Sequence, residues 1–155
     1  MERLSEDHQQ LLDGEHVSGP AADTYKHRVQ AAHQQFAGRV LANHHQARDM
    51  LTNPLLQIYP GRAMTCVFDQ HKALCQLRSA EGDIRITPDQ DDCRPNCRNI
   101  AYTDRDIAQL RAQTTQLQEQ LGDYLAPSPR HRRLRADLDR LRDIIRDHQQ
   151  ERRPR

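Results

Sequence analysis

Four cysteines, the only ones in this chain of 155 residues, lie close together in the sequence. Eight residues separate Cys66 from Cys75, three separate Cys93 from Cys97, and 17 residues lie between the two pairs. Thiolates are soft ligands, and two short-spaced pairs on separate loops can supply the four donors of a tetrahedral zinc site. The pattern therefore predicts a metal site formed by Cys66, Cys75, Cys93 and Cys97, with zinc as the cofactor.

Other states of the four thiols stay open at this point: free structural thiols, two disulfides, or the ligands of an iron–sulfur cluster. The compartment decides between disulfides and a metal. The N-terminal sequence has no apolar run that would serve as a signal peptide, and no stretch approaches the roughly 18 apolar residues of a membrane span. We therefore expect a cytoplasmic chain with reduced cysteines and no membrane contact. His71, between Cys66 and Cys75, is either an alternative ligand or an exposed side chain.

The composition limits the size of the core that must position these residues. The chain is 35% hydrophobic and 4% aromatic, which suits elongated helices or a small domain stabilised by a metal. The spacing of apolar and turn-forming residues predicts a mainly α fold in four segments. These are an N-terminal helical segment (1–53), a Cys-rich zinc module of loops and short strands (54–102), an antiparallel helical hairpin (103–150) and a basic tail (151–155).

The helical segments are predicted from apolar stripes at spacings of three and four. In the first segment the stripe consists of Tyr25, Val29, Ala32, Phe36 and Val40. In the hairpin there are two heptad runs: Ile107, Leu110, Thr114, Leu117, Leu121 and Tyr124, then Leu134, Leu138, Leu141, Ile145 and His148. Thr103 and Asp106 form a capping pair, and Ser128-Pro129 begins the second helix. Heptads cannot separate a hairpin from pairing with another chain, so the oligomeric state stays open.

Charge is distributed unevenly along the chain. The net charge is only +1, from 23 basic and 22 acidic residues, but the segment 130–155 contains ten arginines and five acidic residues. Arginines can contact nucleic-acid phosphates without reading sequence. The predicted nucleic-acid-binding residues are Arg130, Arg132, Arg133, Arg135, Arg140 and Arg142. The alternative is a solvated helix face with Asp–Arg pairs, which would leave the helices to mediate only protein association.

Several segments of the chain resemble a known family. They include 19–23 (GPAAD), 36–39 (FAGR), 46–49 (QARD), 53–58 (NPLLQI), 66–68 (CVF), 72–75 (KALC) and above all 92–105 (DCRPNCRNIAYTDR). Together these are similar to the C-terminal, cysteine-bearing region of integrase-like proteins of actinobacterial mobile elements. The resemblance covers roughly residues 13–150, and its most specific part is the string from Cys93 to Arg105. It implies that a catalytic core of the tyrosine-recombinase type precedes this region and is absent from this chain.

The residues themselves predict no catalytic site. A tyrosine recombinase requires a nucleophilic tyrosine and a cluster of arginines and histidines around the scissile phosphate. His45 and Arg48 match one such element only superficially, and Tyr59 and Tyr102 flank the cysteine module. No Gly-rich phosphate loop, Ser/His/Asp array or nucleotide fingerprint is evident in the sequence. We therefore expect a non-catalytic module of an integrase-like protein that assists DNA binding or recombinase assembly. A protein-association module and a thiol or iron–sulfur redox sensor are the alternatives.

Overall fold

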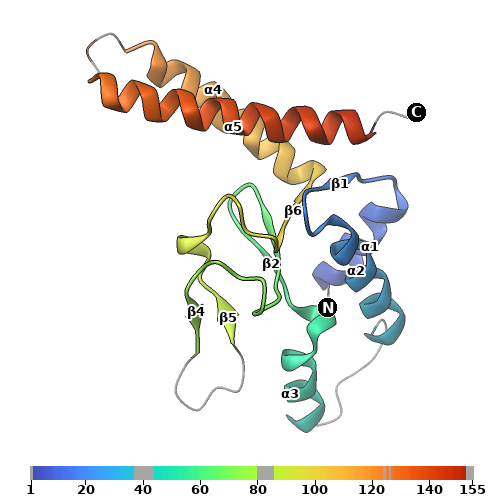
Figure 1. Cartoon of the computed structure of the whole chain (residues 1–155). Helices are drawn as coiled ribbons and strands as arrows, with labels where there is room; N and C mark the ends of the chain where they lie inside the picture. The colour runs from blue at the N-terminus through green and yellow to red at the C-terminus, as the bar shows by residue number, and fades with distance from the viewer. Residues whose placement is uncertain (1, 37–43, 80–85, 124, 126, 153–155) are drawn as a thin grey trace.

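The computed structural model describes residues 2–36, 44–79, 86–123, 125 and 127–152, and in α3 it leaves the side chains of 44, 47 and 51 undescribed. In this part of the chain, helices cover and extend from a small antiparallel sheet (Figure 1). The helices are α1 (Glu2–Leu12), α2 (Ala22–Phe36), α3 (His44–Thr52), α4 (Asp104–Leu121) and α5 (Ser128–Arg152). The predicted mainly helical fold is confirmed at this level. None of the described helices is long and apolar enough to cross a membrane.

The sheet has the strand order β1-β6-β3-β2, and every neighbouring pair is antiparallel. Its strands are β1 (Val17–Ser18), β2 (Ile58–Pro60), β3 (Thr65–Val67) and β6 (Ile100–Thr103). A separate ribbon pairs β4 (Leu77–Arg78) with β5 (Thr87–Pro88), and short 3-10 turns cover Pro54–Leu56 (η1) and Gln90–Asp92 (η2). The sequence analysis predicted short strands in the middle segment but none at β1. The N-terminal segment therefore contributes an edge strand to the sheet.

Helix α2 buries the predicted apolar stripe. Tyr25, Val29, Ala32 and Phe36 are all buried, and the first two pack with Val17 and Val67 of the sheet. Val40, the last member of the predicted stripe, lies outside the described residues. One side of the sheet is therefore covered by α2, with α1 packed beside it (Figure 1).

Helices α4 and α5 pack together as a helical pair, as the two heptad runs predict (Figure 1). The Thr103 hydroxyl accepts a hydrogen bond from the Asp106 amide, and the Asp106 side chain accepts one from the Thr103 amide, so the predicted capping box is present. Ile107, Leu110, Leu138 and Leu141 are buried, whereas Tyr124 lies outside the described residues. The connected ends of the two helices project beyond the rest of the molecule.

An ionic cluster joins the start of α4 to the N-terminal segment. Arg105 Nη2 lies 3.0 Å from Asp7 Oδ1, and its Nε and Nη2 donate to the two Glu15 carboxylate oxygens at 3.2 and 3.1 Å. Asp7 is only 4% exposed, and a buried carboxylate without a partner would cost several kcal/mol. Arg105 therefore fixes α1 and the following loop against the root of the hairpin.

Candidate functional site

The four cysteines occupy different parts of the middle segment. Cys66 lies at the centre of β3 and is buried, and Cys97 is also buried. Cys75 is half-buried before β4, and Cys93 follows η2 and is exposed. All four are free thiols. No disulfide therefore joins them in the structure.

Backbone hydrogen bonds bring the cysteine-bearing loops together. Cys66 is the register partner of Ile100, and the Val67 amide donates to the Asn99 carbonyl at 2.7 Å. This pairing fixes β3 beside the residues that follow Cys97. The Cys97 thiol in turn faces the Lys72 carbonyl at 4.0 Å, in the loop that carries Cys75. The sheet and this loop thus bring Cys97 between Cys66 and Cys75.

Cys75 and Cys93 are brought together by the β4–β5 ribbon and η2. The Gln76 amide donates to Asp92 Oδ2 at 3.1 Å, and the Asp89 amide donates to the Gln76 carbonyl at 3.1 Å. Gln76 follows Cys75, and Asp92 precedes Cys93. Elements far apart in the sequence therefore gather all four thiols in one region.

The electrostatics of the thiols reflect this gathering. Burial, followed by the negative charges of Cys93, Cys97 and Cys75, raises the pKa of Cys66 to about 12. The pKa of Cys93 is also raised, first by burial and then by Cys97 and Cys75. The raised pKa values of Cys66 and Cys93 favour their protonated forms unless a cation compensates the charge of the thiolates. Soft donors with this requirement fit a zinc ion chemically.

The types of the four side chains suit a zinc ion, but their arrangement does not yet form a metal site. Among the described residues, no three His, Cys, Asp or Glu side chains are already arranged to hold a metal ion. The convergence of the four sulfurs on one ion therefore stays a prediction. His71 is exposed, and its amide donates to Asp69 Oδ1 at 2.9 Å.

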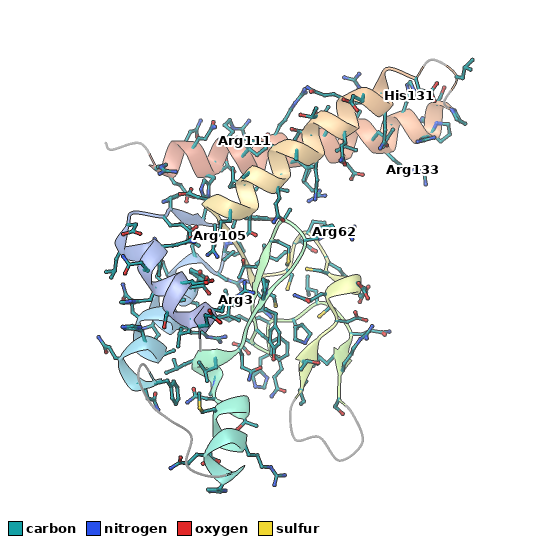
Figure 2. All side chains as sticks on the ribbon, turned by 180° about the vertical axis from the view of Figure 1, so that it is seen from behind. Arg3, Arg62, Arg105, Arg111, His131 and Arg133 are labelled. Carbon is teal, nitrogen blue, oxygen red and sulfur yellow. The ribbon has the colours of Figure 1, made fainter. Side chains whose placement is uncertain are left out.

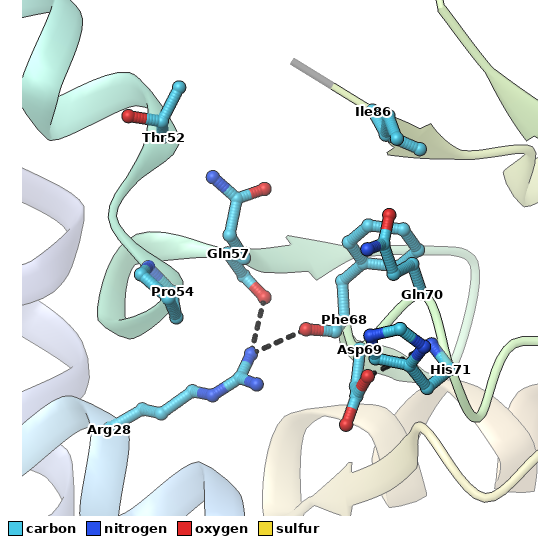
Figure 3. A pocket seen from close by; sticks show the side chains of 9 residues that line it. All are labelled: Arg28, Thr52, Pro54, Gln57, Phe68, Asp69, Gln70, His71 and Ile86. Carbon is cyan, nitrogen blue, oxygen red and sulfur yellow. Dashed lines mark hydrogen bonds between the residues drawn. The ribbon is translucent and has the colours of Figure 1, made fainter. Parts of the chain in front are cut away.

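Arg28 of α2 supports the cysteine loop from outside. Its Nη1 donates to the carbonyl oxygens of Gln57 at 3.1 Å and Phe68 at 2.8 Å, on one wall of a cavity of about 480 Å³ (Figure 3). Burial lowers the pKa of Arg28, while the charges of Asp69 and Cys66 oppose this shift. The sequence analysis missed this residue, because its partners are backbone carbonyls and only the fold brings them together.

The six predicted nucleic-acid-binding arginines all lie on the surface of α5, between positions 130 and 142. Helical spacing places Arg132, Arg135 and Arg142 on one flank and Arg133 and Arg140 on the other. Figure 2 shows Arg133 extending outward from the projecting part of the hairpin. Within the described part of the chain, no carboxylate forms an ion pair with any of these six arginines. They are Arg130, Arg132, Arg133, Arg135, Arg140 and Arg142.

Two acidic residues of α5 form ion pairs with Arg146, which is not one of the six arginines. Asp143 lies 2.9 Å and Asp147 3.6 Å from the guanidinium group of Arg146. From Arg130 to Arg142 the helix has six arginines and two aspartates, Asp137 and Asp139. This half of α5 therefore presents an excess of positive charge to solvent.

A buried polar cluster joins the other end of the hairpin to β1. His148 is 2% exposed, and its Nδ1 lies 2.6 Å from Ser18 Oγ while its Nε2 lies 2.7 Å from Asp104 Oδ1. Arg152 Nη1 donates to Asp104 Oδ2 at 3.0 Å. In the sequence His148 continues the heptad run and gives no sign of these partners, which are as many as 130 positions away.

Comparisons with protein-family models, with curated proteins and with solved structures find no match to this chain.

Proposed function

We propose that this chain is a zinc-stabilised module of an integrase-like protein, without a recombinase catalytic site of its own, that contacts DNA through the part of α5 between positions 130 and 142. The observation that carries the proposal is a set of six exposed arginines on a projecting helical pair, none of which forms an ion pair with a carboxylate of the described residues. Such groups attract phosphates and release counterions on binding. The resemblance of the Cys93–Arg105 string supports the integrase-like context, and the lack of an N-terminal apolar run in the sequence supports a cytoplasmic location.

The zinc ion has a structural role in this proposal. Cys66, Cys75, Cys93 and Cys97 would hold it, and as a Lewis acid it would keep the four thiols deprotonated and cross-link their loops. Cys97 belongs to the same buried cluster as Ile107, Leu110 and Leu141 of the hairpin. We call the described part of the chain that precedes α4 the body. A metal at the cysteines would therefore stabilise the body, against which the basic helix α5 packs.

The test of DNA binding is the affinity for a duplex of mixed sequence as a function of salt concentration. Each phosphate contact contributes about 0.9 to the slope of log K against log salt. Replacing Arg132, Arg133 and Arg135 with glutamine should therefore reduce the slope by up to about 2.7 and weaken binding on unrelated sequences alike.

The matched control removes three exposed arginines of the body, at positions 48, 62 and 98, and lowers the net charge by the same amount. An equal loss in this control would mean that net charge, and not α5, determines binding. Failure of the wild-type chain to bind at low salt would favour the alternative of protein association.

Metal analysis of the purified protein tests the cofactor separately. Zinc in a one-to-one ratio, released together with a loss of unfolding free energy on chelation, is the expected result. Visible absorbance and iron in anaerobically purified protein would instead support the redox-sensor alternative.

A further inference from the structure

The buried cluster between β1 and the hairpin has the arrangement of a nucleophile, a base and an orienting carboxylate. We propose that Ser18, His148 and Asp104 form an acyl-transfer site that hydrolyses short-chain carboxylic esters. This inference does not require DNA binding, although Arg140 belongs to both proposed sites. It begins from the two short contacts of His148, 2.6 Å to Ser18 Oγ and 2.7 Å to Asp104 Oδ1.

The hydrogen-bond directions follow from the charges of the groups. Partial burial raises the pKa of Asp104, but hydrogen bonds from His148 and the His16 amide and the charge of Arg152 outweigh it, so this pKa lies below its usual value. Asp104 is therefore a carboxylate and only accepts, so the proton of a neutral His148 is on Nε2. His148 Nδ1 is left to accept the Ser18 hydroxyl proton, as a general base must.

The surroundings of His148 keep it neutral near pH 7. Burial lowers its pKa, and the nearby ring of His16, 4.7 Å away between centroids, lowers it further, while Asp104 and Glu151 oppose this. The other groups at this site are Ser18 from β1 and Arg152 from the end of α5. A neutral imidazole is the form required to accept a proton.

Ser18 also reaches a cavity that can accept a substrate. A pocket of about 280 Å³ is lined by Ser18, by the apolar residues Pro20, Ile100 and Ile144, by Tyr102 and Arg140, and by the acidic residues Asp147 and Glu151. The apolar part suits the short acyl chain of an uncharged ester, whose carbonyl oxygen would face Arg140, whereas the two acidic residues would disfavour an anionic substrate. Gly19, with φ +93°, turns the chain directly after Ser18, and a Cβ there would lie 3.0 Å from the Ile100 carbonyl oxygen.

The reaction would proceed in two steps, acylation of Ser18 and hydrolysis of the acyl-serine. Ser18 Oγ attacks the ester carbonyl carbon as its proton passes to His148 Nδ1, and Arg140 stabilises the oxyanion. The C–O bond to the alcohol breaks, and the alcohol leaves with the proton from His148. Water then attacks the acyl-serine with His148 again accepting a proton, which releases the carboxylic acid and restores Ser18. Asp104 acts as a positioning residue for the imidazole.

The test uses the full-length wild-type protein and a fluorophosphonate probe, with the labelled serine located by peptide mass spectrometry. We expect labelling of Ser18 and not of the exposed Ser79, and release of p-nitrophenol from p-nitrophenyl acetate. The labelling rate should increase with pH and have its midpoint below pH 6.5, because the pKa of His148 is lowered from 6.5.

A His148→Gln variant that keeps its helical circular dichroism should label at least about a hundredfold more slowly, the usual contribution of a general base. A Ser79→Ala variant should react as the wild type does. Absence of the label from Ser18 in the folded wild-type protein, or labelling of Ser18 no faster than of Ser79, would overturn the proposal without reference to any variant.

Discussion

Leu141 provides the most direct test of how the hairpin is attached to the body. It is 4% exposed and belongs to a buried cluster with Cys97, Ile100 and Tyr102 of the body and Ile107 and Leu110 of α4. Truncation to alanine removes buried methyl and methylene groups and leaves a cavity, which in well-packed cores costs about 2–5 kcal/mol. Because the cluster joins three elements that cannot all move inward, we expect Leu141→Ala to lie in the upper half of this range.

Such a loss would be a large fraction of the roughly 5–15 kcal/mol by which domains are usually stable. The assay is urea unfolding followed by circular dichroism, with the slope m compared between variants. The matched control is Leu125→Ala, since Leu125 is 94% exposed and its truncation should change the unfolding free energy by no more than about 0.5 kcal/mol. Equal effects of the two truncations would refute the packing of α5 on the body described above.

Three further predictions concern polar groups. Burial lowers the pKa of His148 in the folded protein, so folding should become less favourable as pH falls below about 6.5. In His148→Gln this part of the pH dependence of unfolding should disappear, whereas the exposed His27→Gln should retain it. Asp106→Ala should cost about 1–3 kcal/mol in urea unfolding, because it leaves the buried Thr103 amide and Thr65 hydroxyl without an acceptor. Arg28→Met keeps much of the apolar stem but removes both hydrogen bonds to carbonyls. We expect faster amide hydrogen exchange at residues 68–73 with little change in α5. An equal increase of the exchange rate in both segments would contradict a local role of Arg28.

Much of the helical part of the fold could be predicted because its signals are local. The stripe of α2 and the heptads of α4 and α5 are repeated every three or four residues, and Thr103 and Asp106 form a cap within one turn. Strand β1 could not be predicted in the same way. It has two residues, Val17 and Ser18, and exists only because β6, more than 80 positions away, offers an edge.

In the candidate site, too, the features with a local sequence signal could be predicted and the long-range contacts could not. Residue types and spacing suffice to single out the cysteines, because four thiols in a short stretch have few roles. The residues that hold the cysteine loops in place are harder to find. Arg28 donates to two backbone carbonyls, and Asn99 Nδ2 donates to the Asp69 carbonyl at 2.9 Å. Backbone acceptors have no sequence signature, so these contacts can be found only from the fold.

The string from Cys93 to Arg105 shows how one segment can connect the cysteines to the hairpin. Cys93 and Cys97 supply two of the thiols, Ile100 to Thr103 form the strand between β1 and β3, and Arg105 binds Asp7 and Glu15. Successive residues thus serve the thiol cluster, the sheet, the helix cap and the ionic cluster. A change in the cysteine loops would be transmitted directly to the first turn of α4, since Thr103 is both the end of β6 and the cap of that helix. If the proposed function holds, a metal bound at the cysteines would therefore influence the DNA contact of α5 through this strand and α4.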